Sequence, residues 1–283
     1  MYMEDIKILT QAILSLKQET NYFKDYIFPI AIAFFSSFIG ALLAYFVFHR
    51  QERIVAEKLK LDTVNKWFLL GDELHQSLIA IKFNYYNQLN SDPYQRVFAV
   101  PSILLNEENY RFDYHELVFI SDVNGKKWSN IPYLRTLFSN YSSLISIWKT
   151  RNNLNEKVRS QIMKANDKNI TYIDLVDSQI EVFANQSDLA TLIDLTETAL
   201  RLTDDLIIEF HNFLNEFPNT VKDKIKLNLI KNYGFVLRYD SSNNESIKSI
   251  LKVTPLPNYA KLSIILGRSE EELMARYSSL FHE

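Results

Sequence analysis

Residues 26–48 form an apolar stretch, YIFPIAIAFFSSFIGALLAYFVF, that contains no charged side chain. A helix needs about 20 such residues to cross a bilayer, and at about 1.5 Å per residue this stretch reaches about 34 Å. The alternatives fit less well. A buried helix of a soluble protein rarely carries so long an apolar run, and a signal peptide has a shorter run followed by a cleavage site. The stretch therefore predicts one membrane-spanning helix.

Small side chains recur along one face of this helix at spacings of three and four residues; they are Ala33, Ser36, Ser37, Gly40, Ala41 and Ala44. Such a pattern lets membrane helices approach closely, so it predicts self-association. The alternative is that small residues are simply common in spanning helices. Bulky residues cover the other faces, and Phe34, Phe35 and Phe38 are candidates for a hydrophobic constriction that closes a pore.

Basic residues on either side of the stretch set its expected orientation. Five of them follow it closely (Arg50, Arg53, Lys58, Lys60 and Lys66), whereas three precede it (Lys7, Lys17 and Lys24). Cytoplasmic flanks of spanning helices carry an excess of lysine and arginine. We therefore expect residues 1–25 to form a short extracytoplasmic amphipathic segment, residues 26–48 the transmembrane helix, and residues 49–283 a cytoplasmic domain.

Apolar residues recur at helical spacing through most of this domain, which predicts a helical bundle and an all-α membrane protein. The spanning helix is expected to continue to about Leu89, with Gly71 as a weak point or a close-packing position. Other long helices are expected from Pro132 to about residue 165 and from Tyr172 to Phe217, the latter divided near Asn185 and ended by Pro218. Shorter helices are expected over residues 220–232 and after Ser269, where Ser269 with Glu272 fits a capping box. Residues 235–239 and 247–253 can pair as a small β-hairpin.

The sequence lacks the signatures of the common enzyme classes. It has five glycines and no cysteine, and it contains no phosphate-binding loop, dinucleotide fingerprint or nucleophile elbow. The five histidines are never three to five residues apart, which excludes a helical His-x-x-x-His pair. His115 beside Asp113 and Glu116 is more typical of a polar turn than of a metal site. We predict no catalytic site, metal site or cofactor, although a dispersed catalytic group of residues remains an alternative.

Charge is segregated along the second half of the chain. Residues 167–216 carry eleven acidic and two basic side chains, whereas residues 220–268 carry nine basic and three acidic ones. The basic stretch also contains several aromatic residues, a combination that suits phosphate contacts and base stacking. It predicts a site for a nucleotide or short oligonucleotide at Lys222, Lys224, Lys226, Lys231, Arg238, Lys248 and Lys252. The alternative is that the two stretches neutralise each other across the bundle.

The architecture resembles the single-pass membrane effectors of bacterial anti-phage defence systems, including the effector of Hailong-type systems. The shared features are a short outer segment, one aromatic-rich spanning helix with a small-residue stripe, and a helical domain of this size. No diagnostic motif is matched, so no functional residue is carried over. The resemblance implies a homo-oligomeric ion channel in the bacterial inner membrane that disrupts the membrane potential of infected cells in abortive infection.

The same resemblance implies a nucleotide or oligonucleotide signal and a regulatory enzyme encoded nearby. A pore needs several spanning helices, so we expect an oligomer of four or more chains. The alternative is a membrane-anchored helical scaffold or adaptor that conducts no ions. Toxicity with rapid loss of membrane potential would distinguish the channel from the scaffold.

Overall fold

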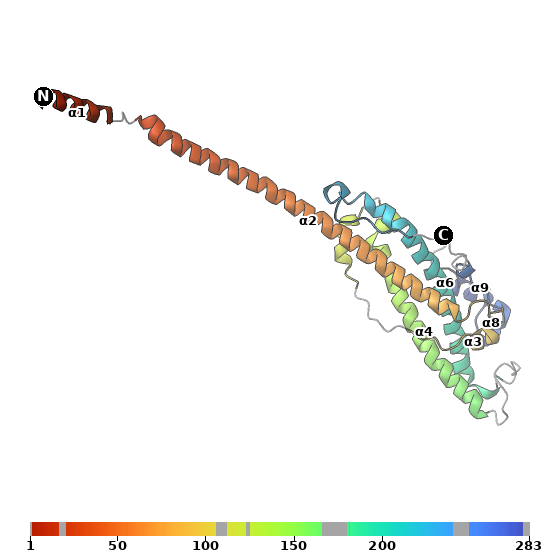
Figure 1. The fold of residues 1–283 in the computed structure, drawn as a ribbon. Helices are drawn as coiled ribbons and strands as arrows, with labels where there is room; N and C mark the ends of the chain where they lie inside the picture. The colour runs from red at the N-terminus through yellow and green to blue at the C-terminus, as the bar shows by residue number, and fades with distance from the viewer. Residues whose placement is uncertain are drawn as a thin grey trace. The chain divides into compact units, whose positions relative to one another are not determined.

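The computed structural model describes residues 2–16, 21–105, 112–122, 125–165, 180, 182–239 and 249–279. Within these residues every regular element is a helix and no strand occurs (Figure 1). The all-α prediction is confirmed for this part of the chain. The chain divides into two compact units, Met1–Ala56 and Glu57–Glu283.

The first unit contains helix α1 and the start of α2, which a π-helical turn precedes. Helix α1 spans Tyr2–Leu16, the π-helix η1 spans Phe23–Ile27, and α2 begins at Phe28. Pro29 falls in the first turn of α2, where its missing N–H group has no helical partner to lose. The helical stretch Phe23–Phe83 is the one segment among the described residues that is long and apolar enough to cross a membrane. The predicted length and composition of a spanning helix are therefore confirmed.

The second unit packs around three long helical segments. Helix α2 spans Phe28–Phe83 and contributes its residues from 57 onward, α4 spans Ile131–Ala165, and α6 spans Gln186–Lys222. Short helices cover them: α3 (Pro93–Ala99), α8 (Tyr259–Leu266) and α9 (Glu270–Arg276), together with the 3-10 helices Tyr114–Ile120, Lys127–Ser129 and Leu227–Leu229.

Aromatic rings fill the space between the three long helices. Trp67 of α2 packs edge-to-face on Phe138 of α4, which in turn packs edge-to-face on Phe213 of α6. Gly71 permits this approach, because a Cβ atom there would lie 2.5 Å from Cε1 of Phe213. Gly71 is therefore a close-packing position, one of the two roles that the sequence left open.

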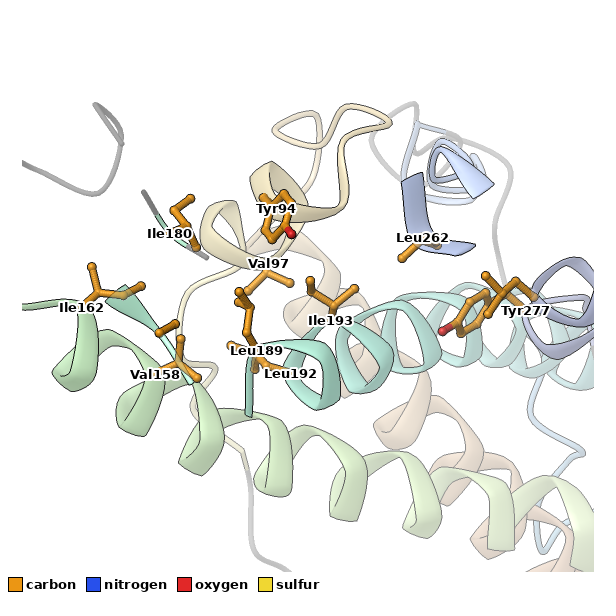
Figure 2. Packing of buried hydrophobic residues seen from close by; sticks show 12 residues of the cluster. Tyr94, Val97, Val158, Ile162, Ile180, Leu189, Leu192, Ile193, Leu262 and Tyr277 are labelled. Carbon is orange, nitrogen blue, oxygen red and sulfur yellow. The ribbon is translucent and has the colours of Figure 1, made fainter. Parts of the chain in front are cut away.

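A second apolar cluster joins the short helices to α4 and α6 (Figure 2). Tyr94 and Val97 of α3, Val158 of α4, Leu192 of α6 and Leu262 of α8 all belong to it. Leu273 of α9 also belongs to it, and the side chains at the starts of α8 and α9 cap these short helices. The side chain of Asn258 accepts the N–H of Lys261 at the start of α8, and Ser269 with Glu272 forms the predicted capping box of α9.

Several predicted boundaries differ from the structure. Helix α2 ends at Phe83 rather than Leu89, and α6 runs through Pro218 to Lys222 instead of stopping there. Proline removes one helical hydrogen bond, but Pro218 is buried against the core, and this packing maintains the helix. The division near Asn185 is confirmed, because its side chain caps α6. The helix start at Tyr172 lies outside the described residues.

The region after α6 differs most from expectation. No α-helix forms over residues 224–239, where a 3-10 turn, other turns and irregular chain occur instead. Residues 235–239 and 251–253 form no strand, and residues 249–250 are helical, so the described parts of the predicted hairpin are not paired. The side chain of Asn65 explains the first of these segments. Its amide donates to the carbonyl of Phe235 at 2.9 Å and its carbonyl accepts the N–H of Leu237 at 3.0 Å, taking the bonds that a partner strand would make.

Candidate functional site

The small-residue stripe of α2 lies on a fully solvent-facing stretch of the first unit. All six of its residues are exposed, as are Phe34, Phe35 and Phe38. A Cβ atom added to Gly40 would meet no atom within 4 Å. The single chain therefore leaves both faces of the apolar helix free for lipid or for another helix.

The acidic stretch is neutralised by cations from other parts of the second unit. The ion pairs are Lys157–Asp188, Arg276–Asp194, Arg96–Glu197, Lys82–Asp204 and Lys127–Glu209. In the basic stretch, Lys224 pairs with Asp122 and Lys261 with Asp92. These ion pairs join each stretch to other parts of the second unit. Mutual neutralisation of the two stretches stays a prediction.

A surface groove of about 400 Å³ brings together two of the predicted anion-binding residues. Lys222, in the last turn of α6, and Arg238 line it together with an aromatic side chain, Phe235. The remaining lining is apolar and consists of Pro218, Leu227, Val236 and Leu237. We call this feature the Lys222–Arg238 groove. Neither Lys222 nor Arg238 makes an ion pair with a described residue, so both charges remain available.

The backbone of the groove wall is held in place from α2. The two hydrogen bonds from Asn65 fix the chain on either side of Val236, whose side chain is buried. The side chain of Val236 is thus buried, whereas that of its neighbour Phe235 faces outward. Phe235 is 72% exposed, which is unusual for a large aromatic residue on a fixed backbone.

The other predicted cations do not line this groove. Lys226, Lys231 and Lys252 are exposed elsewhere on the surface, and Lys224 is held by Asp122. The backbone N–H of Lys226 donates to Glu57 at 2.7 Å. Burial alone would raise the pKa of Glu57, but hydrogen bonds from Lys60 and from this N–H outweigh it and lower that pKa. Lys248 lies outside the described residues.

The polar turn around His115 is confirmed. The side chain of Asp113 accepts the N–H of His115 and caps the helix Tyr114–Ile120, while Glu116 pairs with Lys66 at 2.8 Å. Both acids are thus engaged in local structure. In the part of the chain that the structure describes, no group of three histidine or acidic side chains is arranged to hold a metal ion.

A buried polar network was not predicted from the sequence. Arg96 binds Glu197 through two bonds of 2.7 and 2.8 Å and donates to the carbonyl of Pro255 at 2.7 Å. Burial raises the pKa of Glu197, and the charge of Arg96 opposes this rise. Beside it lies a cavity of about 20 Å³, which is enough for about one water molecule but too small for an organic substrate. The network therefore holds the chain at Pro255 against α3 and α6.

A second unpredicted feature is a group of three rings at the interface of α2, α6 and the groove wall. The rings of His75, His211 and Tyr239 have centroids 5.6 to 6.1 Å apart. Neither ring nitrogen of His75 has a hydrogen-bond partner among the described residues, and its side chain is fully buried. Burial, together with the nearby His211, lowers the pKa of His75 to about 4. The one sequence feature that could have predicted the burial of His75 was its position within the apolar stripe of α2.

Comparisons with known proteins returned no relative: no family model matches the chain, and no match was found among curated proteins or solved structures. The function is therefore inferred from the residues of this chain.

Proposed function

We propose that this protein is a single-pass membrane effector whose spanning helices associate into an ion-conducting homo-oligomer. The supporting observation is the apolar helix of the first unit, which has the length of a membrane span and an exposed stripe of small residues. Bilayers accept backbone only where its hydrogen bonds are satisfied, so a helix is a suitable spanning element. One helix cannot enclose a pore, and a channel therefore requires at least four chains.

The small residues supply the contact and the aromatic residues supply the gate in this proposal. Ser36, Gly40 and Ala44 allow helix backbones to approach closely, because they present little side chain to the neighbour. Phe34, Phe35 or Phe38 narrows the pore and keeps it free of water when closed. The second unit then lies in the cytoplasm of a bacterium and receives an anionic signal, a nucleotide or oligonucleotide made by a regulatory enzyme. The opened channel depolarises the cell and stops phage propagation.

Substitution of Gly40 by leucine tests the packing of the helices. Because the protomer leaves open space around Gly40, added bulk there disturbs only contacts with another chain. We expect Gly40→Leu to insert normally but to lose crosslinked oligomers and to lose depolarisation, measured with a voltage-sensitive dye in expressing cells. Ala31→Leu is the matched control, since nine residues are two and a half helical turns and place it on the opposite face.

Each result bears on a different part of the proposal. An unchanged oligomer in Gly40→Leu would refute the stripe as the interface. A wild-type protein that forms oligomers yet leaves the membrane potential unchanged would favour the scaffold over the channel. Loss of oligomer in both Gly40→Leu and Ala31→Leu would show that bulk anywhere on the helix is disruptive, and the stripe would again lose its role.

A further inference from the structure

The Lys222–Arg238 groove combines three features that a small anionic ligand requires. It is concave, with a volume of about 400 Å³, within the range of about 300–1,000 Å³ that is typical of small-molecule sites. Among the described residues its lining is mostly apolar, with Lys222 and Arg238 as the charged members. None of these described lining residues is acidic, so none of them repels an anion.

The two cations differ in what they can contribute. Lys222 lies in the last turn of α6, where the helix dipole places a partial negative charge. Part of the positive charge of Lys222 therefore offsets that partial charge. Arg238 lies outside any helix and has no ion-pair partner among the described residues, so its charge is free for a ligand. A planar guanidinium also binds phosphate through two parallel hydrogen bonds. Arg238 therefore contributes the larger share of anion recognition.

Phe235 provides a surface for stacking. Its side chain is 72% exposed while its backbone is held by Asn65, so a stacking ring need not order the backbone at this position. Aromatic side chains beside cations are the usual way in which proteins bind a base and its phosphate without reading the sequence. The groove thus matches a ligand with a planar ring at one end and a phosphate at the other.

We propose that the Lys222–Arg238 groove binds a nucleoside phosphate, with the base stacked on Phe235 and the phosphate held by Arg238 and Lys222. This inference rests on the proposed role of the second unit as the receiver of an anionic signal, and it narrows the predicted site to one groove. A free nucleotide and a unit of a short oligonucleotide share this chemistry. Lys226, Lys231 and Lys252 are not part of the site, although the sequence grouped them with it.

Binding is measured on the detergent-solubilised full-length chain, independently of conduction. The probes are adenosine 5′-monophosphate, adenosine, inorganic phosphate and the single-stranded pentathymidylate, each titrated by calorimetry. We expect the monophosphate to bind at least about tenfold more tightly than adenosine or phosphate alone, because only it uses both ends of the groove. If pentathymidylate binds more tightly than the monophosphate, the ligand is an oligonucleotide. If the monophosphate binds more tightly, the ligand is a free nucleotide.

The variants separate the groove from the general charge of the surface. Phe235→Ala and Arg238→Glu should each weaken binding of the tighter probe by about tenfold or more. Lys231→Glu is the matched charge control, and Phe83→Ala, at an exposed aromatic residue of α2, is the matched ring control. Both controls should stay within about twofold of the wild type. All four positions are exposed, so folding is expected to be preserved, and far-ultraviolet circular dichroism checks it.

Three outcomes would overturn the inference. Equal losses in Lys231→Glu and Arg238→Glu would show a diffuse electrostatic attraction instead of a site. If inorganic phosphate binds as tightly as the monophosphate, then stacking of the base on Phe235 contributes nothing to binding. No binding of either nucleotide probe would remove the site itself, even where the chain conducts ions. Conversely, specific nucleotide binding without any conduction would leave the groove assigned and would refute only the channel.

Discussion

The ammonium group of Lys82 lies 2.7 Å from a carboxylate oxygen of Asp204, and the two side chains are only 4% and 1% exposed. The same pair holds the chain that follows the undescribed residues 240–248. Lys82 donates to the carbonyl of Lys252 at 2.6 Å, and Asp204 accepts the N–H of Thr254 at 2.6 Å. One ion pair thus joins α2, α6 and the segment that leads to α8.

Replacement of Lys82 by methionine should destabilise the second unit strongly. It would leave Asp204 charged, buried and unpaired, and breaking a buried pair in this way costs about 3–5 kcal/mol of the free energy of unfolding. Lys157→Met is the control, because Lys157 pairs with Asp188 at an exposed position where such pairs contribute about 0–1 kcal/mol. Urea unfolding followed by tryptophan fluorescence measures both, since Trp67, Trp128 and Trp148 all lie buried in the second unit. If Lys82→Met and Lys157→Met lower the free energy of unfolding equally, then the Lys82–Asp204 pair does not stabilise the second unit as a buried pair.

The long helices were predictable because their signal is periodic and local. Apolar residues of α4 and α6 recur at the helical period, and those of α4 at this period, such as Leu137 and Trp148, are buried. The boundaries were less predictable. Pro218 stays helical because tertiary burial outweighs a local rule, and the predicted strand over 235–239 is replaced by hydrogen bonds from Asn65, a residue 170 positions away. Contacts at such a separation leave no local pattern.

The candidate site was predictable only in part. Charge counting located a basic stretch, but it could not tell Lys224, which pairs with Asp122, from Lys222 and Arg238, which line a groove. That distinction depends on which acids lie nearby in space. The buried pair of Arg96 and Glu197 could not be predicted either, because each residue alone is typical of a solvated helix face.

Gly71 gives a prediction about the close packing of α2 against α6. Gly71→Ala should lower the free energy of unfolding by about 1–3 kcal/mol, because its Cβ would lie within 3 Å of the buried ring of Phe213. Helix propensity alone predicts the opposite sign, a gain of about 1 kcal/mol. Gly40→Ala in the same helix is the control and should leave urea unfolding of the second unit unchanged. The double variant with Gly71→Ala and Phe213→Leu should lose less free energy of unfolding than the sum of the losses in the two single variants.

The orientation of the chain gives a prediction about topology. Excess lysine and arginine after residue 48 favours a cytoplasmic second unit. A C-terminal fusion to green fluorescent protein should be fluorescent, whereas a C-terminal fusion to alkaline phosphatase should be inactive in cells. Replacing Arg50 and Arg53 by glutamine reduces the bias, and we expect it to raise the phosphatase signal. A strong phosphatase signal from the unchanged sequence would place the second unit outside the cytoplasm.

His75 should make the second unit sensitive to mild acid. The groups around it are His211 on α6, whose pKa burial also lowers, and Tyr239, whose pKa is raised first by its own burial and then by Asp72 of α2. With a native pKa of about 4 against 6.5, His75 binds a proton in the unfolded state before it does in the native state. Stability therefore falls as the pH falls from about 6.5 to about 4, with a total loss of about 3 kcal/mol from this group.

The measurement compares urea unfolding at pH 7.5 and pH 5.0, which should differ by about 2 kcal/mol through His75 alone. His75→Leu removes the titrating group, so its own loss between the two pH values should be smaller than that of the wild type by this amount. The absolute stability of the variant is not the readout, because leucine also changes the packing. His115→Leu, at an exposed histidine, is the matched control and should keep the wild-type difference. If His75→Leu and the wild type lose the same free energy between pH 7.5 and pH 5.0, then His75 is not buried neutral in the native state.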